Sequence, residues 1–234
     1  MSGLLEIAVR HTKDAERAEA GGANRLQVVG SLDFGGLSPE PSLVGQIRRV
    51  TSLSLRPVLR LREGFSTDGG EASRLRGLIE AYRAAGAEGV VAGFLNAHNE
   101  IDEPVLAELL SQPDSAWTFS RAIDSCISTD RAWRILRRLT GLDCVLTAGS
   151  ARGVTEGLDD LVERAAADEF ARSVIMVGDG LLAEHVPWLA RAGIRAFHLG
   201  SAVRPLASWK AYVDADLVRT WRTLIDDAVR RAQG

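Results

Sequence analysis

The chain has 234 residues, of which 46% are hydrophobic, and a formal net charge of −3 at pH 7. This length and composition suit one domain with a full hydrophobic core. The mildly acidic balance gives no electrostatic reason to expect nucleic acid or an anionic membrane as a partner.

The hydrophobic pattern predicts eight strands that alternate with helices. The strands are expected over residues 4–9, 25–30, 55–61, 89–95, a short stretch from about 116, 144–149, 173–180 and 196–202. Helices are expected over 13–21 and 130–139, with the last over 216–232. The second helix is expected to open with Ser38 as N-cap and Pro39 in its first turn.

This alternation predicts the fold class. Eight βα units of similar length are typical of a parallel sheet that closes on itself. An open doubly wound sheet would also alternate, but no G-x-G-x-x-G follows the first strand. The sequence therefore predicts a single (β/α)8 TIM barrel over residues 1–234.

Polar side chains within the apolar strands predict the site. A charged group in a barrel strand is costly against the outer helices, so it is expected to point inward. This inward set is Glu6, Gln27, Arg60, Ser120, Thr147 and His198. Arg62, Arg121 and Asp124 follow strands, where barrel enzymes keep their chemistry.

These residue types suit proton transfer on an anion. Arg60 and Arg121 could orient a carboxylate or a phosphate, because the planar guanidinium binds both. Glu6 or Asp124 could transfer a proton, and His198 could assist near neutral pH. The alternative is a buried Glu6–Arg60 ion pair that serves only the structure of the barrel.

Glycine-containing turns follow the last two strands. Gly178, Gly180, Gly200 and Ser201 occupy places where many barrels bind a phosphate through backbone N–H groups. Such turns also use glycine for positive φ, and Asp179 would repel a phosphate if its side chain faced inward. A phosphate or similar anion is one interpretation of these turns.

The sequence indicates no cofactor. Cys126 and Cys144 lack C-x-x-C spacing, and the other histidines are scattered, so a zinc cluster is not predicted. The weak candidates for metal ligands are Cys126 and His198. The sequence shows no secretory signal, and no run approaches the roughly 18 consecutive apolar residues of a membrane-spanning helix. A cytoplasmic location without membrane spans is therefore expected.

Several motifs carry a resemblance to a known family. They include Gly22-Ala-Asn-Arg-Leu-Gln27, Pro57-Val-Leu-Arg-Leu-Arg62, Thr118-Phe-Ser-Arg-Ala-Ile-Asp124 and Ile175-Met-Val-Gly-Asp-Gly180. With His198, they resemble the CutC family, called copper homeostasis proteins, in register over about residues 4–202. The resemblance implies a TIM barrel, a cytoplasmic location, a role in copper homeostasis and a homo-oligomer, most simply a dimer.

Two motifs depart from the pattern of this family. The family often reads Glu-Ile-Cys where this chain has Glu6-Ile-Ala8, and His-Arg-Ala-Phe-Asp where it has Ser120-Arg-Ala-Ile-Asp124. Cu(I) prefers thiolate and thioether ligands, with imidazole in support. The replaced thiol and imidazole therefore predict weak or indirect copper binding.

Three hypotheses follow from the sequence. The first is metal handling, with copper bound weakly or indirectly. The second is a barrel enzyme that transfers a proton on a small phosphorylated or carboxylated metabolite. The third is a non-catalytic barrel whose helices form a docking surface.

Overall fold

The computed structural model describes residues 2–110 and 116–233. Its residues group into two compact units. Unit one comprises residues 1–26 and 146–234, and unit two comprises residues 27–145. The prediction of one domain over the whole chain stays a prediction.

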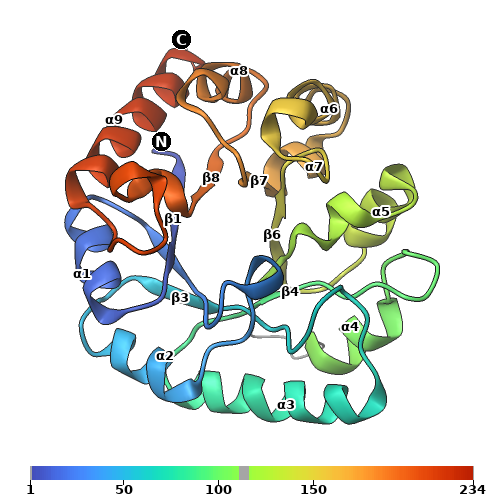
Figure 1. The fold of residues 1–234 in the computed structure, drawn as a ribbon. Coiled ribbons are helices and arrows are strands. Elements are labelled where there is room, and N and C mark those ends of the chain that lie inside the picture. The colour runs from blue at the N-terminus through green and yellow to red at the C-terminus, as the bar shows by residue number, and fades with distance from the viewer. Residues whose placement is uncertain (1, 111–115, 234) are drawn as a thin grey trace. The chain divides into compact units, whose positions relative to one another are not determined.

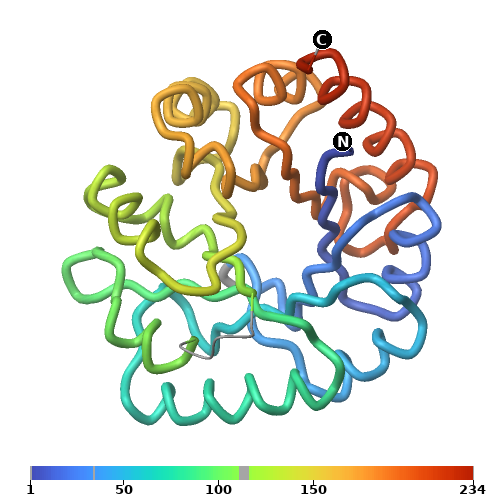
Figure 2. Tube along the Cα trace, turned by 180° about the vertical axis from the view of Figure 1, so that it is seen from behind, coloured from blue at the N-terminus to red at the C-terminus, as the bar shows by residue number. Residues whose placement is uncertain are grey.

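Unit one contains both ends of the chain. Its strands and helices are β1 (Leu4–Val9), α1 (Thr12–Ala20), the start of β2 (Arg25–Val28), the end of β6 (Leu142–Thr147), α6 (Val154–Ala167), α7 (Glu169–Val174), β7 (Ile175–Val177), α8 (Val186–Arg191), β8 (Ala196–Leu199) and α9 (Ala215–Arg231). Short 3-10 helices are η3 (Ala183–His185), η4 (Ser201–Val203) and η5 (Pro205–Ala207). Helix α9, red in Figures 1 and 2, packs against α8 and α1.

Unit two holds the middle of the chain. Its further elements are η1 (Asp33–Gly35), α2 (Pro41–Arg48), β3 (Ser54–Pro57), α3 (Gly69–Ala84), β4 (Val91–Ala92), α4 (Glu103–Leu110), β5 (Trp117–Phe119), η2 (Arg121–Ser125) and α5 (Thr129–Leu136). Helix α3 packs against α2 on one side and α4 on the other (Figure 1).

The strands form one eight-stranded sheet in the order β3-β2-β1-β8-β7-β6-β5-β4. The last strand of this order also meets the first, because Val58 and Val91 form a parallel bridge and the N–H of Leu59 donates to the carbonyl of Val91 at 2.8 Å. Parallel strands in cyclic order, with helices between them, make a (β/α)8 barrel. The predicted fold class is confirmed.

The third strand is shorter than the predicted range of residues 55–61. β3 ends at Pro57, so Arg60 lies beyond it and the alternation of a strand does not fix the direction of its side chain. The backbone N–H of Arg60 instead donates to Oγ of Ser38 at 2.8 Å. The same contact explains why Ser38 does not cap the second helix: α2 begins at Pro41, with Glu40 as its N-cap.

The seventh strand is also shorter than predicted. Residues 173 and 174 belong to α7, whose N-cap Asp168 accepts a hydrogen bond from the N–H of Ala171 at 3.1 Å. This cap starts a separate short helix, so β7 begins only at Ile175. Within the described residues, no helix has the length and apolar character that crossing a membrane requires.

Candidate functional site

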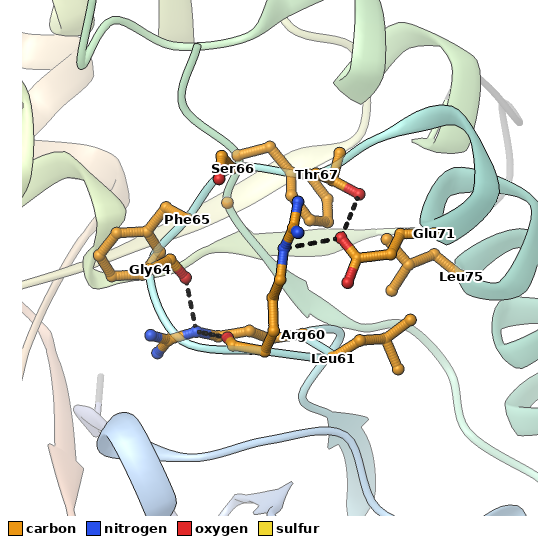
Figure 3. A pocket seen from close by; sticks show the side chains of 11 residues that line it. Arg60, Leu61, Gly64, Phe65, Ser66, Thr67, Glu71 and Leu75 are labelled. Atoms are coloured by element: carbon orange, nitrogen blue, oxygen red, sulfur yellow. Dashed lines mark hydrogen bonds and ion pairs between the residues drawn. The ribbon is translucent and has the colours of Figure 1, made fainter. Parts of the chain in front are cut away.

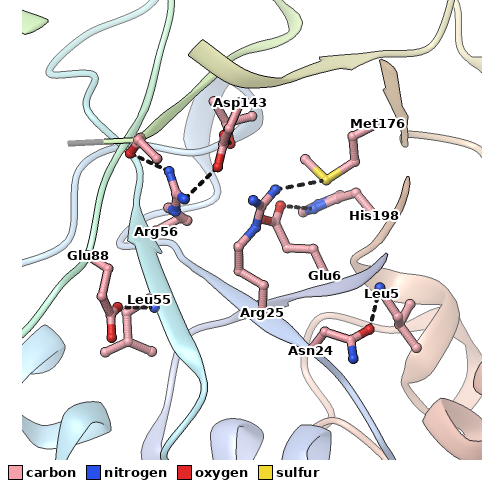
Figure 4. A network of polar contacts seen from close by, with 12 residues as sticks. Leu5, Glu6, Asn24, Arg25, Leu55, Arg56, Glu88, Asp143, Met176 and His198 are labelled. Carbon is pink, nitrogen blue, oxygen red and sulfur yellow. Dashed lines mark hydrogen bonds and ion pairs between the residues drawn. The ribbon is translucent and has the colours of Figure 1, made fainter. Parts of the chain in front are cut away.

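Glu6 and His198 lie side by side on neighbouring strands of unit one. The parallel ladder pairs Glu6 of β1 with His198 of β8 in register, so both side chains leave the same face of the sheet. Nδ1 of His198 lies 2.8 Å from Oε1 of Glu6, and Figure 4 shows the two groups meeting.

Arg25 holds the second oxygen of Glu6. Its Nε donates to Oε2 at 2.5 Å, and its Nη2 lies 3.3 Å from Sδ of Met176. The Glu6 side chain is fully buried. Burial opposes ionisation, but the charge of Arg25 and the hydrogen bond from His198 outweigh it and lower the pKa of Glu6 to about 2. Glu6 is therefore a carboxylate at neutral pH.

The ionised carboxylate determines the role of the imidazole. A carboxylate only accepts hydrogen bonds, so Nδ1 of His198 carries the hydrogen in this contact. In the neutral ring, Nε2 then has the lone pair. The side chain is 11% exposed, so it is not completely sealed from solvent. A histidine held in this way can accept a proton at Nε2 while the carboxylate stabilises the resulting charge.

Sequence reasoning missed two members of this network. Arg25 opens a fully buried strand, and a buried cation needs a partner, which is a signal that could have found it. Met176 lies within the apolar strand β7, and nothing in its sequence context distinguishes it from an ordinary core residue.

Arg60 and Arg62 come together at a pocket of unit two. The pocket is lined by the loop between β3 and α3, by Glu71 and Leu75 of α3, and by Gly93 and Phe94. Nε of Arg60 donates to the carbonyls of Arg62 at 3.1 Å and Gly64 at 2.9 Å. Both predicted arginines therefore line one pocket. Figure 3 shows this pocket from close by, with Arg60 labelled.

Ser120, Arg121 and Asp124 also cluster within unit two. Nε of Arg121 lies 2.9 Å from Oδ2 of Asp124, so these two predicted site residues form an ion pair with each other. Oγ of Ser120 accepts a hydrogen bond from the N–H of Ala122 and caps η2. A Cβ added to Gly93 would lie 2.3 Å from this oxygen, so Ser120 is packed against a wall of the Arg60 pocket.

Cys126 is a protonated thiol at neutral pH. Burial is the main cause, and the nearby carboxylates of Asp124 and Glu100 add to it, so the pKa of Cys126 is raised to about 11. Its Sγ lies 3.6 Å from the carbonyl oxygen of Ala122. A nucleophilic or metal-binding cysteine requires the thiolate, and this environment disfavours it.

Alkylation tests this assignment. At pH 8, iodoacetamide is expected to modify Cys126 roughly 100-fold more slowly than a cysteine of ordinary pKa, because so little thiolate is present. Peptide mass spectrometry over time measures the rate, with the urea-unfolded chain as the reference. Equal rates for Cys126 in the folded and unfolded chains would contradict the raised pKa.

Close packing accounts for glycine after β7 and β8. A Cβ on Gly178 would lie 2.9 Å from Cβ of His198, and one on Gly200 would lie 2.6 Å from the Trp209 indole. Gly180 has φ of 74°, which favours glycine. An anion at these turns stays a prediction.

The remaining predicted ligand-binding residues, Gln27, Thr147 and Ser201, lie on different secondary-structure elements. Gln27 is buried in β2, and Ser201 begins η4. Oγ1 of Thr147 accepts a hydrogen bond from the N–H of Gly149 at 2.9 Å. Thr147 therefore holds the turn after β6.

The residues do not fit a copper ion well. Cys126 keeps its proton, Nδ1 of His198 is committed to Glu6, and the thioether of Met176 lies against the cation of Arg25. Within the described ranges, no group of three or more His, Cys, Asp and Glu side chains is arranged to hold a metal ion. Weak or indirect copper binding stays a prediction.

Comparison with known proteins identifies the family. The CutC family model matches residues 3–203. A CutC family protein of Klebsiella pneumoniae strain 342 is 31% identical over 229 residues, covering 93% of this chain and 92% of its own length. Another, of Xanthomonas axonopodis pv. citri strain 306, is 35% identical over 202 residues, with 83% and 81% covered.

A solved structure shows the same fold. It is CutC of Streptococcus agalactiae, provisionally named a copper homeostasis protein, and it is 21% identical with a TM-score of 0.74. The match covers 85% of this chain and 98% of that one. Because the CutC family model matches most of the length of this chain, the chain belongs to the CutC family.

Proposed function

We propose that this protein is an enzyme that transfers a proton to or from a small anionic metabolite. The observation that supports this proposal is the contact between His198 and the ionised Glu6. A buried ion pair with a purely structural role needs only Glu6 and Arg25, whereas the imidazole adds a group that can accept and donate a proton. We take the substrate to be anionic because arginines such as Arg60 and Arg121 follow predicted strands in the sequence, and guanidinium groups bind carboxylates and phosphates.

Each member of the network has a distinct role in this proposal. Nε2 of His198 accepts the proton, and Glu6 stabilises the imidazolium that forms. Arg25 is a positioning residue, because it keeps Glu6 ionised through the 2.5 Å contact and does not itself exchange a proton. The reaction therefore needs no metal ligand among these side chains.

Hydrogen exchange tests the proposal even though the substrate is not identified. The protein is incubated in D₂O with carboxylated and phosphorylated metabolites, and ¹H NMR follows the C–H groups next to their carbonyls. We expect protein-dependent exchange in at least one compound. His198→Gln is expected to slow this exchange by roughly 10²–10⁴-fold, the usual contribution of a general base.

A second histidine variant is the matched control. His11 is exposed and packs edge-on against Tyr212, with 5.4 Å between the ring centroids. His11→Gln is expected to exchange at the wild-type rate. Wild-type exchange in His198→Gln, with an unchanged melting temperature, would remove the proton-transfer role.

A role in copper homeostasis is the second candidate, and the provisional name of the Streptococcus agalactiae relative favours it. Since the candidate ligands fit copper poorly, we propose that any such role acts without tight binding at Cys126 or His198. Anaerobic titration with Cu(I) tests this, and submicromolar affinity that is lost in Cys126→Ser or His198→Gln would contradict it.

We further propose that the protein acts in the cytoplasm as a homodimer. Gel filtration with light scattering can check the dimeric state.

A further inference from the structure

Strand β7 runs beside β8 and faces the pair formed by Glu6 and His198. The two residues before Gly178 pair with the two residues before His198 in the parallel ladder, so Gly178 lies opposite His198. Residues two apart on a strand share a face, and Sδ of Met176 lies 3.3 Å from Nη2 of Arg25. Figure 4 shows Met176 and His198 extending toward Arg25 and Glu6. The face of β7 at Gly178 is therefore turned toward the network.

Space, rather than backbone conformation, requires a glycine at position 178. The φ of Gly178 is not positive, so another residue could adopt the same backbone. A Cβ at this position would lie 2.9 Å from Cβ and 3.1 Å from Cδ2 of His198, and 2.9 Å from Cδ1 of Leu146. Carbon atoms in good contact are about 3.5–4.0 Å apart. The side chain of His198 therefore lies in space that a side chain on Gly178 would take.

The imidazole of His198 is confined on two opposite edges. Its Cδ2 edge lies against Gly178, whose N–H donates to the carbonyl of Thr147 at 3.1 Å and ties the end of β7 to the end of β6. On the other edge, Nδ1 lies 2.8 Å from Oε1 of Glu6, and Arg25 holds that carboxylate in turn. The order of the sheet agrees, since β8 lies between β1 and β7. A methyl group at position 178 would therefore have to displace the ring.

The position of the ring decides which of its nitrogens carries the hydrogen. With Nδ1 of His198 at the ionised Glu6, Nδ1 keeps the hydrogen and Nε2 has the lone pair. A ring that is turned or shifted loses this arrangement, because a hydrogen bond weakens steeply as its angle departs from linearity. The space at Gly178 therefore affects the tautomer of the proposed base, and not only the packing of the strands.

We propose that Gly178 is a positioning residue of the proton-transfer site. Because it carries no side chain, it leaves room for the Cδ2 edge of His198, and this room lets Nδ1 on the opposite edge reach Glu6. The proposal rests on the proposed function only in taking His198 as the base. The contact with Glu6 and the tautomer of the ring exist without substrate and can be measured without turnover.

The tautomer of His198 tests the proposal. Two-bond ¹H–¹⁵N correlation NMR shows which ring nitrogen carries the hydrogen, and the chain has only 4 histidines to assign. His198→Gln identifies the signal by its loss. At a pH at which the ring is neutral, we expect the wild type to hold the hydrogen on Nδ1. Gly178→Ala is expected to shift the signal toward a mixture of both tautomers, since the contact with Glu6 no longer fixes the hydrogen.

Three further variants separate positioning from a general packing defect. Gly21→Ala would place a Cβ 2.5 Å from Cβ of Val218 and is expected to lower the melting temperature without changing the tautomer. Gly77→Ala meets nothing within 4 Å and is expected to leave the tautomer unchanged. Gly178→Ala with Leu146→Val relieves the contact with Leu146 but not the contact with the imidazole, so the altered tautomer is expected to remain. This double variant also reports the tautomer if Gly178→Ala alone does not fold.

The outcomes distinguish this inference from the proposed function. A wild-type tautomer in Gly178→Ala overturns the positioning role, as does its recovery when Leu146→Val is added. An altered tautomer, together with a failure of hydrogen exchange in every metabolite, keeps the positioning role and removes the proton transfer. Where exchange is found, Gly178→Ala is expected to slow it by up to roughly 10²-fold, the usual cost of a small misplacement of a reacting group.

Discussion

Replacing Glu6 with glutamine is expected to lower the free energy of unfolding by about 3 kcal/mol at pH 7. The pKa of Glu6 is about 2 in the folded chain against an ordinary value of 4.5, and a shift of this size corresponds to about 3 kcal/mol in favour of the ionised form. Glutamine imitates the protonated acid, so Arg25 loses the charge that compensates it. For a chain of this size, the melting temperature is expected to fall by roughly 6–12 °C.

A double variant provides the control for Glu6. Arg25→Met alone leaves the carboxylate buried without its cation and is expected to destabilise the protein strongly. Glu6→Gln with Arg25→Met removes both charges, so the combined loss is expected to be smaller than the sum of the single losses. Urea unfolding measures all four proteins, and strictly additive losses would show that the pair is not coupled.

The dependence on pH gives a second test of Glu6. Its pKa is lowered in the folded state, so its contribution to stability is fully present above about pH 4.5 and is lost as the pH falls toward 2. The difference in unfolding free energy between wild type and Glu6→Gln is therefore expected to be constant near neutral pH and to shrink in acid. A difference that stays constant from pH 7 to pH 3 would contradict the lowered pKa.

Replacing Asp14 with alanine is expected to lower the free energy of unfolding by about 3–5 kcal/mol. Both oxygens of Asp14 accept hydrogen bonds from Arg204, at 3.1 and 3.0 Å, and both side chains are almost completely buried. Asp14 also accepts the N–H groups of Arg10 and Val213. Alanine would leave a buried guanidinium without its carboxylate and two backbone donors without their acceptor.

An exposed ion pair serves as the control for Asp14. Asp216 pairs with Arg219 on the surface of α9, and exposed pairs of this kind contribute little to stability. Asp216→Ala is therefore expected to change the urea midpoint only slightly. A loss in Asp14→Ala no larger than that in Asp216→Ala would show that the buried pair does not hold the segment near Val213 against α1.

The shared face of Glu6 and His198 could be predicted because it depends on a local property. Side chains alternate along a strand, so a polar residue between apolar neighbours faces away from them. The same argument failed for Arg60, because its strand ends at Pro57 and the hydroxyl of Ser38 takes its backbone N–H. Sequence reasoning did not foresee a hydrogen bond between residues 22 positions apart.

The (β/α)8 fold follows from the sequence alone, since the order of apolar strands and amphipathic helices is repeated along the chain and does not depend on which residues touch. Which charges meet depends on the folded arrangement of the strands. Glu6 is joined to Arg25 and His198, which lie 19 and 192 positions away, and such partners depend on the register between strands. Register is set by the packing of the whole sheet, whereas the hydrophobic pattern reports only the burial of each segment.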